Sequence, residues 1–292
     1  MKKYDTIIIG HISKDTNTDL DGTVNSVGGA VVYSSASAAV ASQVAVLTKT
    51  APAERDDLLP SLRVIDQEKD IFYLPSKFST AIKNQYFTVD RERRTCQAVT
   101  IADPFTLEDI PTIESTVYHL AVLIYGDFPE TLITDLARLG RVAVDVQGFV
   151  RHSVDGEMVF HDWKYKKEYL PQIYYFKTDA AEAELLTGES DIFKAAAILR
   201  DWGAREVMIT HNTQVVVSSD EGTFSSPIRS RNFTGRTGRG DTCFAAYYTW
   251  RLIHSCEEAT RYAAALVSLK METPGPFTGD LADVENFISA FY

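Results

Sequence analysis

The residues best suited to chemistry lie near the C-terminal end of the chain, in the segment Gly235-Arg236-Thr237-Gly238-Arg239-Gly240-Asp241. An apolar run that favours a helix, residues 243–253, follows at once. Glycine lets consecutive backbone N–H groups turn toward one point, and a helix N-terminus adds partial positive charge, so this segment is suited to hold a phosphate. Asp241 lies beside the cradle as a candidate base. The alternative is a left-handed glycine turn in which Asp241 only caps the helix.

Other well-known sites are excluded by spacing. The chain has no G-x-x-x-x-G-K-[ST], and its glycine segment lies far from the first strand and helix, where G-x-G-x-x-G is expected. The 6 histidines show no H-E-x-x-H spacing, and no G-x-S-x-G supplies a serine nucleophile. A hydrolase is therefore not indicated.

Composition indicates a cytoplasmic globular protein. The chain has 292 residues, of which 45% are hydrophobic and 24% charged, enough for a large core. Its formal charge of −11 argues against nucleic-acid and anionic-membrane binding, and the short apolar run at residues 7–9 is no signal peptide or membrane span. Cys96, Cys243 and Cys256 show no disulfide or zinc pattern, so we expect small core residues there.

The alternation of apolar patterns predicts an α/β fold. Helical spacing occurs over residues 30–42, 129–139 and 192–202, and Gly140 and Gly203 stand where C-terminal caps belong. Between these stretches lie β-branched runs at residues 6–9, 44–48, 117–123, 142–146, 173–176, 207–210 and 215–218. We therefore expect one domain over residues 1–292, with a mostly parallel sheet covered by helices and a ligand beyond the carboxyl ends of the strands.

One region departs from this alternation. Residues 71–101 are rich in Phe, Tyr, Thr and Val around a polar turn at residues 90–93, which predicts extended strands. This region is expected to form a β lid.

The glycine segment resembles the signature D-[TS]-T-G-A-G-D of the pfkB (ribokinase-like) family of sugar, polyol and nucleoside kinases. Residues 7–15 are similar to that family's first strand and G-x-x-x-x-D, with the glycine pair following at Gly28-Gly29. Residues 177–188 are similar to its K-x-N-x-x-E-A-x-x-L-T-G segment. Within the family, residues 29–35 and 144–151 look most like the branch of archaeal and plant myo-inositol kinases.

The resemblance implies a ribokinase-like three-layer sandwich with a small β lid, built from residues 11–27 and 71–101, that closes over the substrate. It also implies transfer of a phosphoryl group from ATP to a hydroxyl of a sugar or polyol. It implies that Asp241 is the catalytic base and that the amides of Gly238, Arg239 and Gly240 form an anion hole. The remaining implied roles are substrate binding by Asp15, Gly28, Gly29 and Tyr33, nucleotide binding by Lys177, Thr210, Asn212 and Thr237, and binding of Mg²⁺ through water by Glu182 and Asp179. A homodimer formed through the lid is a further expectation.

Purely structural interpretations of these residues remain open beside the functional roles. Asp15 could be a turn residue, Glu182 a solvated helix residue and Asp179 a helix N-cap. An aromatic ring at Tyr33 could stack on a nucleobase or pack under the lid.

Several positions depart from the family pattern. Gly235 replaces an aspartate associated with a monovalent-cation site, so cation activation is not expected. Tyr33 replaces the asparagine that binds ribose, so the expected substrate is an inositol-like cyclic polyol. Asn212 and Val215 replace both glycines of the T-x-G-x-x-G nucleotide loop, which predicts a reshaped loop. A nucleoside kinase and a non-catalytic sugar- or nucleotide-binding homologue stay open as alternatives.

Overall fold

The β-branched runs of the sequence form a large sheet in the computed structural model, which describes residues 2–88 and 94–292. In spatial order its strands are β15 (Gly222–Pro227), β14 (Gln214–Ser219), β13 (Glu206–Thr210), β12 (Tyr175–Asp179), β9 (Arg141–Asp145), β8 (Glu114–Leu120), β1 (Lys3–Ile9), β4 (Val44–Thr50) and β5 (Ile71–Pro75). From β13 to β5 every neighbouring pair is parallel, whereas β14 and β15 add antiparallel at one edge. The predicted α/β fold with a mostly parallel sheet is confirmed.

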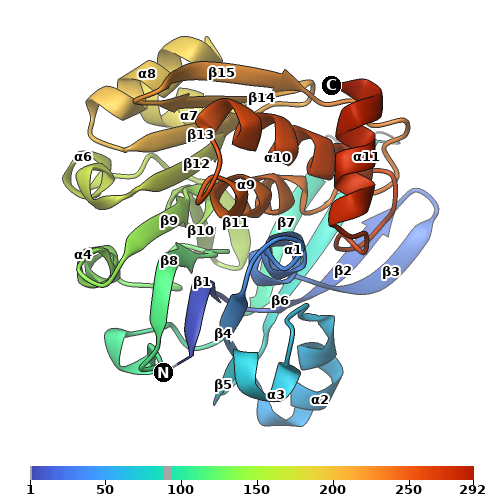
Figure 1. Cartoon of the computed structure of the whole chain (residues 1–292). Coiled ribbons are helices and arrows are strands. Elements are labelled where there is room, and N and C mark those ends of the chain that lie inside the picture. The colour runs from blue at the N-terminus through green and yellow to red at the C-terminus, as the bar shows by residue number, and fades with distance from the viewer. Residues whose placement is uncertain (1, 89–93) are drawn as a thin grey trace.

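Helices cover both faces of this sheet (Figure 1). One face carries α1 (Ala30–Ala38), α9 (Arg239–Trp250) and α10 (Cys256–Lys270), with α11 (Leu281–Phe291) packed against α10. The other carries α4 (Thr131–Ala137), α6 (Lys166–Tyr169), α7 (Ala180–Thr187) and α8 (Ile192–Asp201). Short helices α2 (Arg55–Leu58), α3 (Gln67–Asp70) and α5 (Gln147–Val150), and 3₁₀ turns Pro52–Glu54, Leu59–Ser61, Leu107–Asp109 and Leu170–Gln172, lie in the connections.

Burial on both faces explains the continuous apolar runs. In β1, Ile8 packs into the core under α1 and α9, whereas Ile7 and Ile9 pack into the core under α4 and α8. All three are 0% exposed. Because successive side chains of a strand point to opposite faces, a strand covered on both sides must be apolar at every position.

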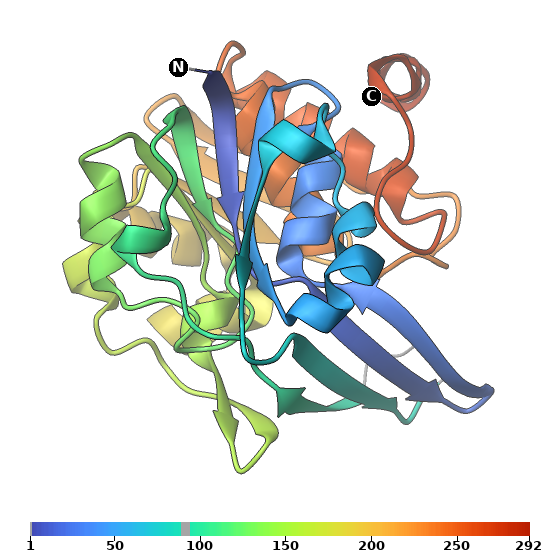
Figure 2. The ribbon, with the colours of Figure 1, turned by 90° about the horizontal axis from the view of Figure 1, so that it is seen from below.

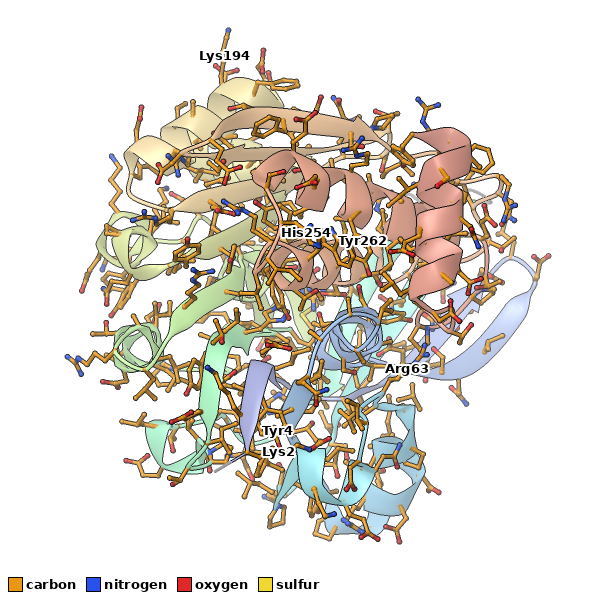
Figure 3. The ribbon with its side chains drawn as sticks, viewed as in Figure 1. Lys2, Tyr4, Arg63, Lys194, His254 and Tyr262 are labelled. Atoms are coloured by element: carbon orange, nitrogen blue, oxygen red, sulfur yellow. The ribbon has the colours of Figure 1, made fainter. Side chains whose placement is uncertain are left out.

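Aromatic stacking fixes α10 against the end of α9. His254 and Tyr262, labelled in Figure 3, both stack on the ring of Trp250, with centroid distances of 4.2 and 4.1 Å. A capping box at Ser255 and Glu258 starts α10. The orientation of α10 matters below because its last residue, Lys270, reaches the glycine segment.

A second sheet projects from one end of the layered body (Figure 2). Its strands in order are β10 (Arg151–Val154), β11 (Glu157–Phe160), β7 (Arg94–Thr100), β6 (Thr80–Tyr86), β2 (Ser13–Asp19) and β3 (Gly22–Gly28). We call this sheet the lid. Strands β2, β6 and β7 fall within the two segments expected to form it, and β3 extends one residue beyond them, to Gly28. The polar turn predicted at residues 90–93 lies outside the described residues.

Two details of the lid differ from the sequence prediction. Strand β5, inside residues 71–101, pairs in parallel with β4 and belongs to the large sheet instead. Strands β10 and β11 extend the lid beyond the small one expected, because an Asp155-Gly156 turn with φ of 51° and 87° closes a hairpin that joins β7. None of the helices within residues 2–88 and 94–292 is long and apolar enough to cross a membrane.

Candidate active site

A pocket of about 830 Å³ lies between the carboxyl ends of the parallel strands, the lid and the start of α9. Its lid end is lined by Ser13, Asp15, Ile82, Asn84, Tyr86 and Cys96. Its floor is lined by Asp145, Gln147, Arg151, Lys177, Asp179 and Thr210, and its far wall by residues 233–234 and 236–241. The position agrees with the rule that ligands of parallel sheets bind beyond the strand ends.

The glycine segment forms a left-handed turn that opens α9. Gly238 caps the helix with φ of 74°, and a Cβ there would lie 2.2 Å from the ring of Tyr33. A Cβ on Gly240 would lie 3.0 Å from the Lys177 ammonium. The first N–H groups of a helix have no acceptor inside it, so those of Gly240 and Asp241 are available to an anion. The Arg239 N–H, by contrast, already donates to the carbonyl of Arg236 at 3.3 Å.

Small residues let α1 approach this turn. Ser37 donates a hydrogen bond to the Thr242 carbonyl at 2.7 Å, and Ser34 donates to the Asp241 carbonyl at 3.4 Å. Both serines are buried. Side chains of this size allow two helices to pack closely, and their hydroxyls satisfy carbonyl groups at the crossing, which fixes the start of α9.

Asp241 lies on the pocket wall in the first turn of α9, surrounded by charges of both signs. Burial raises the pKa of its carboxyl to about 6, and the Asp145 carboxylate adds to this rise. Lys177, Arg151 and Lys270 favour the ionised form and oppose it. A carboxyl with a pKa near 6 is ionised at neutral pH and still basic enough to accept a proton.

A buried ion pair forms the floor below Asp241. Lys177 on β12 lies in register with Asp145 on β9, and its ammonium donates to that carboxylate at 2.8 Å. Burial alone would lower the pKa of Lys177, but the carboxylates of Asp145, Glu182 and Asp179 outweigh burial and raise it. Lys177 therefore stays protonated, and its ammonium lies next to Gly240.

Asp179 and Glu182 cap helix α7. The Glu182 N–H donates to Asp179 and the Asp179 N–H donates to Glu182, both at 2.8 Å, which is a capping box. Burial raises the pKa of Glu182 to about 8. Of the two, Asp179 lines the pocket. Within the described residues no group of three or more His, Cys, Asp or Glu side chains could hold a metal ion directly.

The lid end of the pocket presents a carboxylate and neutral polar groups. Asp15 on β2 accepts a hydrogen bond from Ser13 at 2.7 Å. A Cβ on Gly28 would lie 2.4 Å from the Asp15 carboxylate, and a Cβ on Gly29, where φ is 103°, would lie 2.5 Å from the His11 carbonyl. The glycine pair therefore leaves room for Asp15 and for the entry into α1.

The pocket brings together most residues predicted from the sequence. Those that line it are Asp15, Gly29, Tyr33, Lys177, Asp179, Thr210, Thr237, Gly238, Arg239, Gly240 and Asp241. Gly28 lies behind Asp15, Glu182 lies behind Asp179, and Asn212 lies in the turn between β13 and β14, so these three do not line it. Sequence reasoning gave no role to Asp145, Arg151, Asn84 or Lys270.

Comparisons with known proteins agree with this geometry. A family model described as pfkB family carbohydrate kinase matches residues 114–281. Cytidine kinase of Thermococcus kodakarensis is 27% identical over 266 residues, which cover 86% of this chain and 91% of that protein.

Solved structures give closer matches over nearly the whole chain. A pyrophosphate-dependent kinase of the ribokinase family, complexed with a pyrophosphate analog and myo-inositol, is 35% identical with a TM-score of 0.87, covering 96% of this chain and 99% of its own. A pyrophosphate-dependent myo-inositol-1 kinase converted into a myo-inositol-3 kinase is 34% identical with a TM-score of 0.85, covering 98% of both chains.

Proposed function

The chain belongs to the pfkB family of carbohydrate kinases, and from that premise we propose that it transfers a phosphoryl group from pyrophosphate to a hydroxyl of myo-inositol or a similar cyclic polyol. Phosphotransfer to an alcohol is the activity of its close structural relatives. The observation that carries the proposal is that Asp241, the start of α9, Lys177 and Asp15 of the lid all line one pocket. A phosphoryl donor fits one end and a polyol the other.

The proposed reaction uses Asp241 as general base. Its carboxylate accepts the proton of the acceptor hydroxyl, the freed oxygen forms a bond to phosphorus, and the bond from phosphorus to the leaving phosphate breaks. The products are the polyol phosphate and inorganic phosphate. The N–H groups of Gly238, Gly240 and Asp241 and the ammonium of Lys177 stabilise charge on the transferring group.

The proposed donor is pyrophosphate, whereas the sequence led us to expect ATP. Support comes from the two relatives described as pyrophosphate-dependent. Arg236 and Arg239 also line the pocket at positions where the family signature has uncharged residues, and a donor without a nucleoside depends on charge for its affinity. ATP remains a second candidate donor because Thr210 and Thr237, expected to bind a nucleotide, line the same pocket.

Mg²⁺ is proposed to accompany the donor. The residues fit outer-sphere binding, since Asp179 lines the pocket and Mg²⁺ usually keeps several of its waters. Bound there, the ion would neutralise phosphate oxygens. Asp179 would hold its waters, with Glu182 fixing the Asp179 backbone from behind.

The acceptor is proposed from the lid end of the pocket. Asp15 offers two oxygens to adjacent hydroxyls, and Asn84 and Tyr86 on β6 line the same pocket. One face of the Tyr33 ring covers Gly238, so the glycine turn fixes the ring position. A nucleoside acceptor is the alternative, favoured by the 27% identity to a cytidine kinase.

For the acceptor we expect kcat/KM with myo-inositol to exceed that with ribose, fructose or cytidine by about tenfold or more, roughly 1.4 kcal/mol. Asp15→Ala should raise KM for myo-inositol about 10- to 100-fold, since it removes hydrogen bonds to a charged group. Asp21→Ala, at the exposed turn of the same hairpin, is the matched control and should leave KM unchanged. If kcat/KM with cytidine instead exceeds that with myo-inositol by a similar factor, the protein is a nucleoside kinase.

The pH profile of kcat/KM should reflect the ionisation of Asp241. Its pKa is raised to about 6, and the base must be ionised, so kcat/KM should fall about tenfold per pH unit below about pH 6 and stay level above it. The donor phosphates titrate as well, so the residual activity of Asp241→Asn serves as the control. If kcat/KM of Asp241→Asn falls as steeply at low pH, Asp241 is not the titrating group.

We propose a homodimer formed through the lid, because the lid carries exposed apolar side chains. Val24 lies on β3, the edge strand of the lid beside β2, and is 64% exposed, and Val99 on β7 is 65% exposed. Exposed apolar side chains on a sheet and its edge strand favour pairing with a second copy. Light scattering should give twice the chain mass, and Val24→Glu should reduce it to the single-chain mass. A monomer at assay concentration would overturn this proposal.

A further inference from the structure

A lysine outside the pocket lies directly behind the glycine turn. Lys270, the last residue of α10, is 1% exposed, and its ammonium donates hydrogen bonds to the carbonyls of Gly235 and Thr237. These carbonyls lie in the loop whose next residues, Gly238 to Gly240, open the proposed anion hole. The hydrogen-bond partners of this buried charge are thus backbone oxygens, whereas Lys177 and Lys49 each have a carboxylate partner.

The loop is shaped around the end of α10. The Gly235 N–H donates to the Met271 carbonyl at 2.8 Å, and the Thr234 hydroxyl donates to the Glu272 carbonyl at 2.8 Å. A Cβ on Gly235 would lie 1.9 Å from the Thr273 carbonyl oxygen, so only glycine fits there. Carbonyl oxygens of the loop and of the helix end therefore converge on one region. Such a concentration of negative dipole ends favours a cation among them.

Other groups around the ammonium are an aromatic ring and the proposed base. The Nζ atom lies 5.1 Å from the centroid of the Tyr33 ring, and that ring covers Gly238. Burial lowers the pKa of Lys270 to about 8, and Asp241 opposes this fall. Lys270 is therefore mostly charged at neutral pH and acts on Asp241 without forming an ion pair with it.

We propose that Lys270 is a positioning residue that serves as a built-in monovalent cation: held by the Gly235 and Thr237 carbonyls, its ammonium fixes the turn that aims the N–H groups of α9 at the transferring phosphoryl group. This inference rests on the proposed role of that turn as an anion hole. It also explains how the loop keeps its shape with glycine at position 235, where the family signature has a carboxylate. The chain needs no dissolved potassium or sodium for this purpose.

The test is chemical rescue. Lys270→Ala removes the ammonium and leaves space behind the turn, so kcat should fall about 10²–10³-fold, as for the loss of one preorganised donor, while KM for the polyol changes little. Ammonium or potassium chloride should raise this kcat at least tenfold over tetramethylammonium chloride at equal ionic strength, because the larger ion cannot enter. The wild type should give the same kcat in all of these salts, and in sodium chloride, within about twofold.

The matched control is Lys49→Ala. Lys49 is also buried and donates to the Pro104 carbonyl at 2.8 Å and to Asp109 at 2.7 Å, away from the pocket. The kcat of Lys49→Ala should not depend on which cation the added salt supplies. Wild-type kcat in Lys270→Ala, or a lost kcat that no small cation restores, would overturn the proposal.

A second variant covers a failure of Lys270→Ala to fold. Lys270→Gln keeps a neutral donor of similar length, and we expect the Kd of pyrophosphate, measured by calorimetry without polyol, to rise about tenfold. An unchanged Kd would also overturn the proposal. If the wild type neither binds pyrophosphate nor turns over with either donor, the proposed function itself has failed, and that result is distinct from a failure at Lys270.

Discussion

Asp241→Asn should lower kcat by about 10²–10⁴-fold while the Kd values of donor and polyol stay within a few-fold of those of the wild type. Asparagine has the same shape but cannot accept the proton of the hydroxyl. The variant should also melt at a higher temperature at neutral pH. Burial raises the pKa of Asp241 from 3.8 to about 6, so the ionised form opposes folding above about pH 6, and this cost vanishes below about pH 4.

Single-turnover kinetics and thermal melts at pH 4 and pH 7.5 separate the two effects. The melting difference between Asp241→Asn and the wild type should shrink toward pH 4. A kcat within about threefold of the wild type would remove Asp241 from the mechanism. A lower melting temperature at both pH values would mean that the carboxylate is structural.

Lys177→Met should cause both loss of activity and loss of stability. The variant leaves Asp145 buried without its cation, which costs about 3–5 kcal/mol of unfolding free energy. It also removes the positive charge beside Gly240, so we expect kcat to fall by about 10²–10³-fold. Urea unfolding and steady-state kinetics measure the two losses.

The double variant Lys177→Met/Asp145→Asn distinguishes a catalytic from a structural role. Asparagine needs no counter-charge and still accepts the Gln147 N–H that Asp145 accepts at 3.0 Å. Stability should therefore return to within about 1 kcal/mol of the wild type, because replacing a whole buried ion pair is often neutral. Activity should stay low. Recovery of activity together with stability would show that Lys177 only holds the sheet together.

The fold could be predicted where burial leaves a periodic pattern. Strands covered on both faces gave continuous β-branched runs, and α8 showed helical spacing, so these elements were found within a few residues of their ends. Helix α10 was missed because it is buried on most of its surface and rich in small residues, which removes the amphipathic pattern. Strand β15 was missed because most of its positions are exposed and polar.

The site could be predicted where one segment carries it. The glycine turn and Asp241 are contiguous, so their sequence reveals them. Asp145 and Lys270 were missed because their roles depend on partners 32 and 35 residues away, at Lys177 and Gly235. Asp145 had one usable signal, since an aspartate ends an apolar strand run there. Lys270 gave none, because a lysine at a helix end is usually solvated.

The donor is the point at which sequence and relatives diverge. The family pattern suggested ATP, yet the substituted glycines at Asn212 and Val215 already indicated a reshaped nucleotide loop. In the structure Asn212 lies in a tight turn outside the pocket, whereas two arginines of the glycine segment line it. These features favour a small, highly charged donor.

The most direct test is phosphorus-31 NMR of one reaction that contains the protein, myo-inositol, Mg²⁺ and equal amounts of pyrophosphate and ATP. The proposal predicts that the pyrophosphate resonance declines while those of inorganic phosphate and a new phosphomonoester grow in equal amounts and the ATP resonances stay constant. Consumption of ATP with release of ADP, while pyrophosphate persists, would contradict the donor assignment. Absence of any new phosphomonoester would contradict the acceptor.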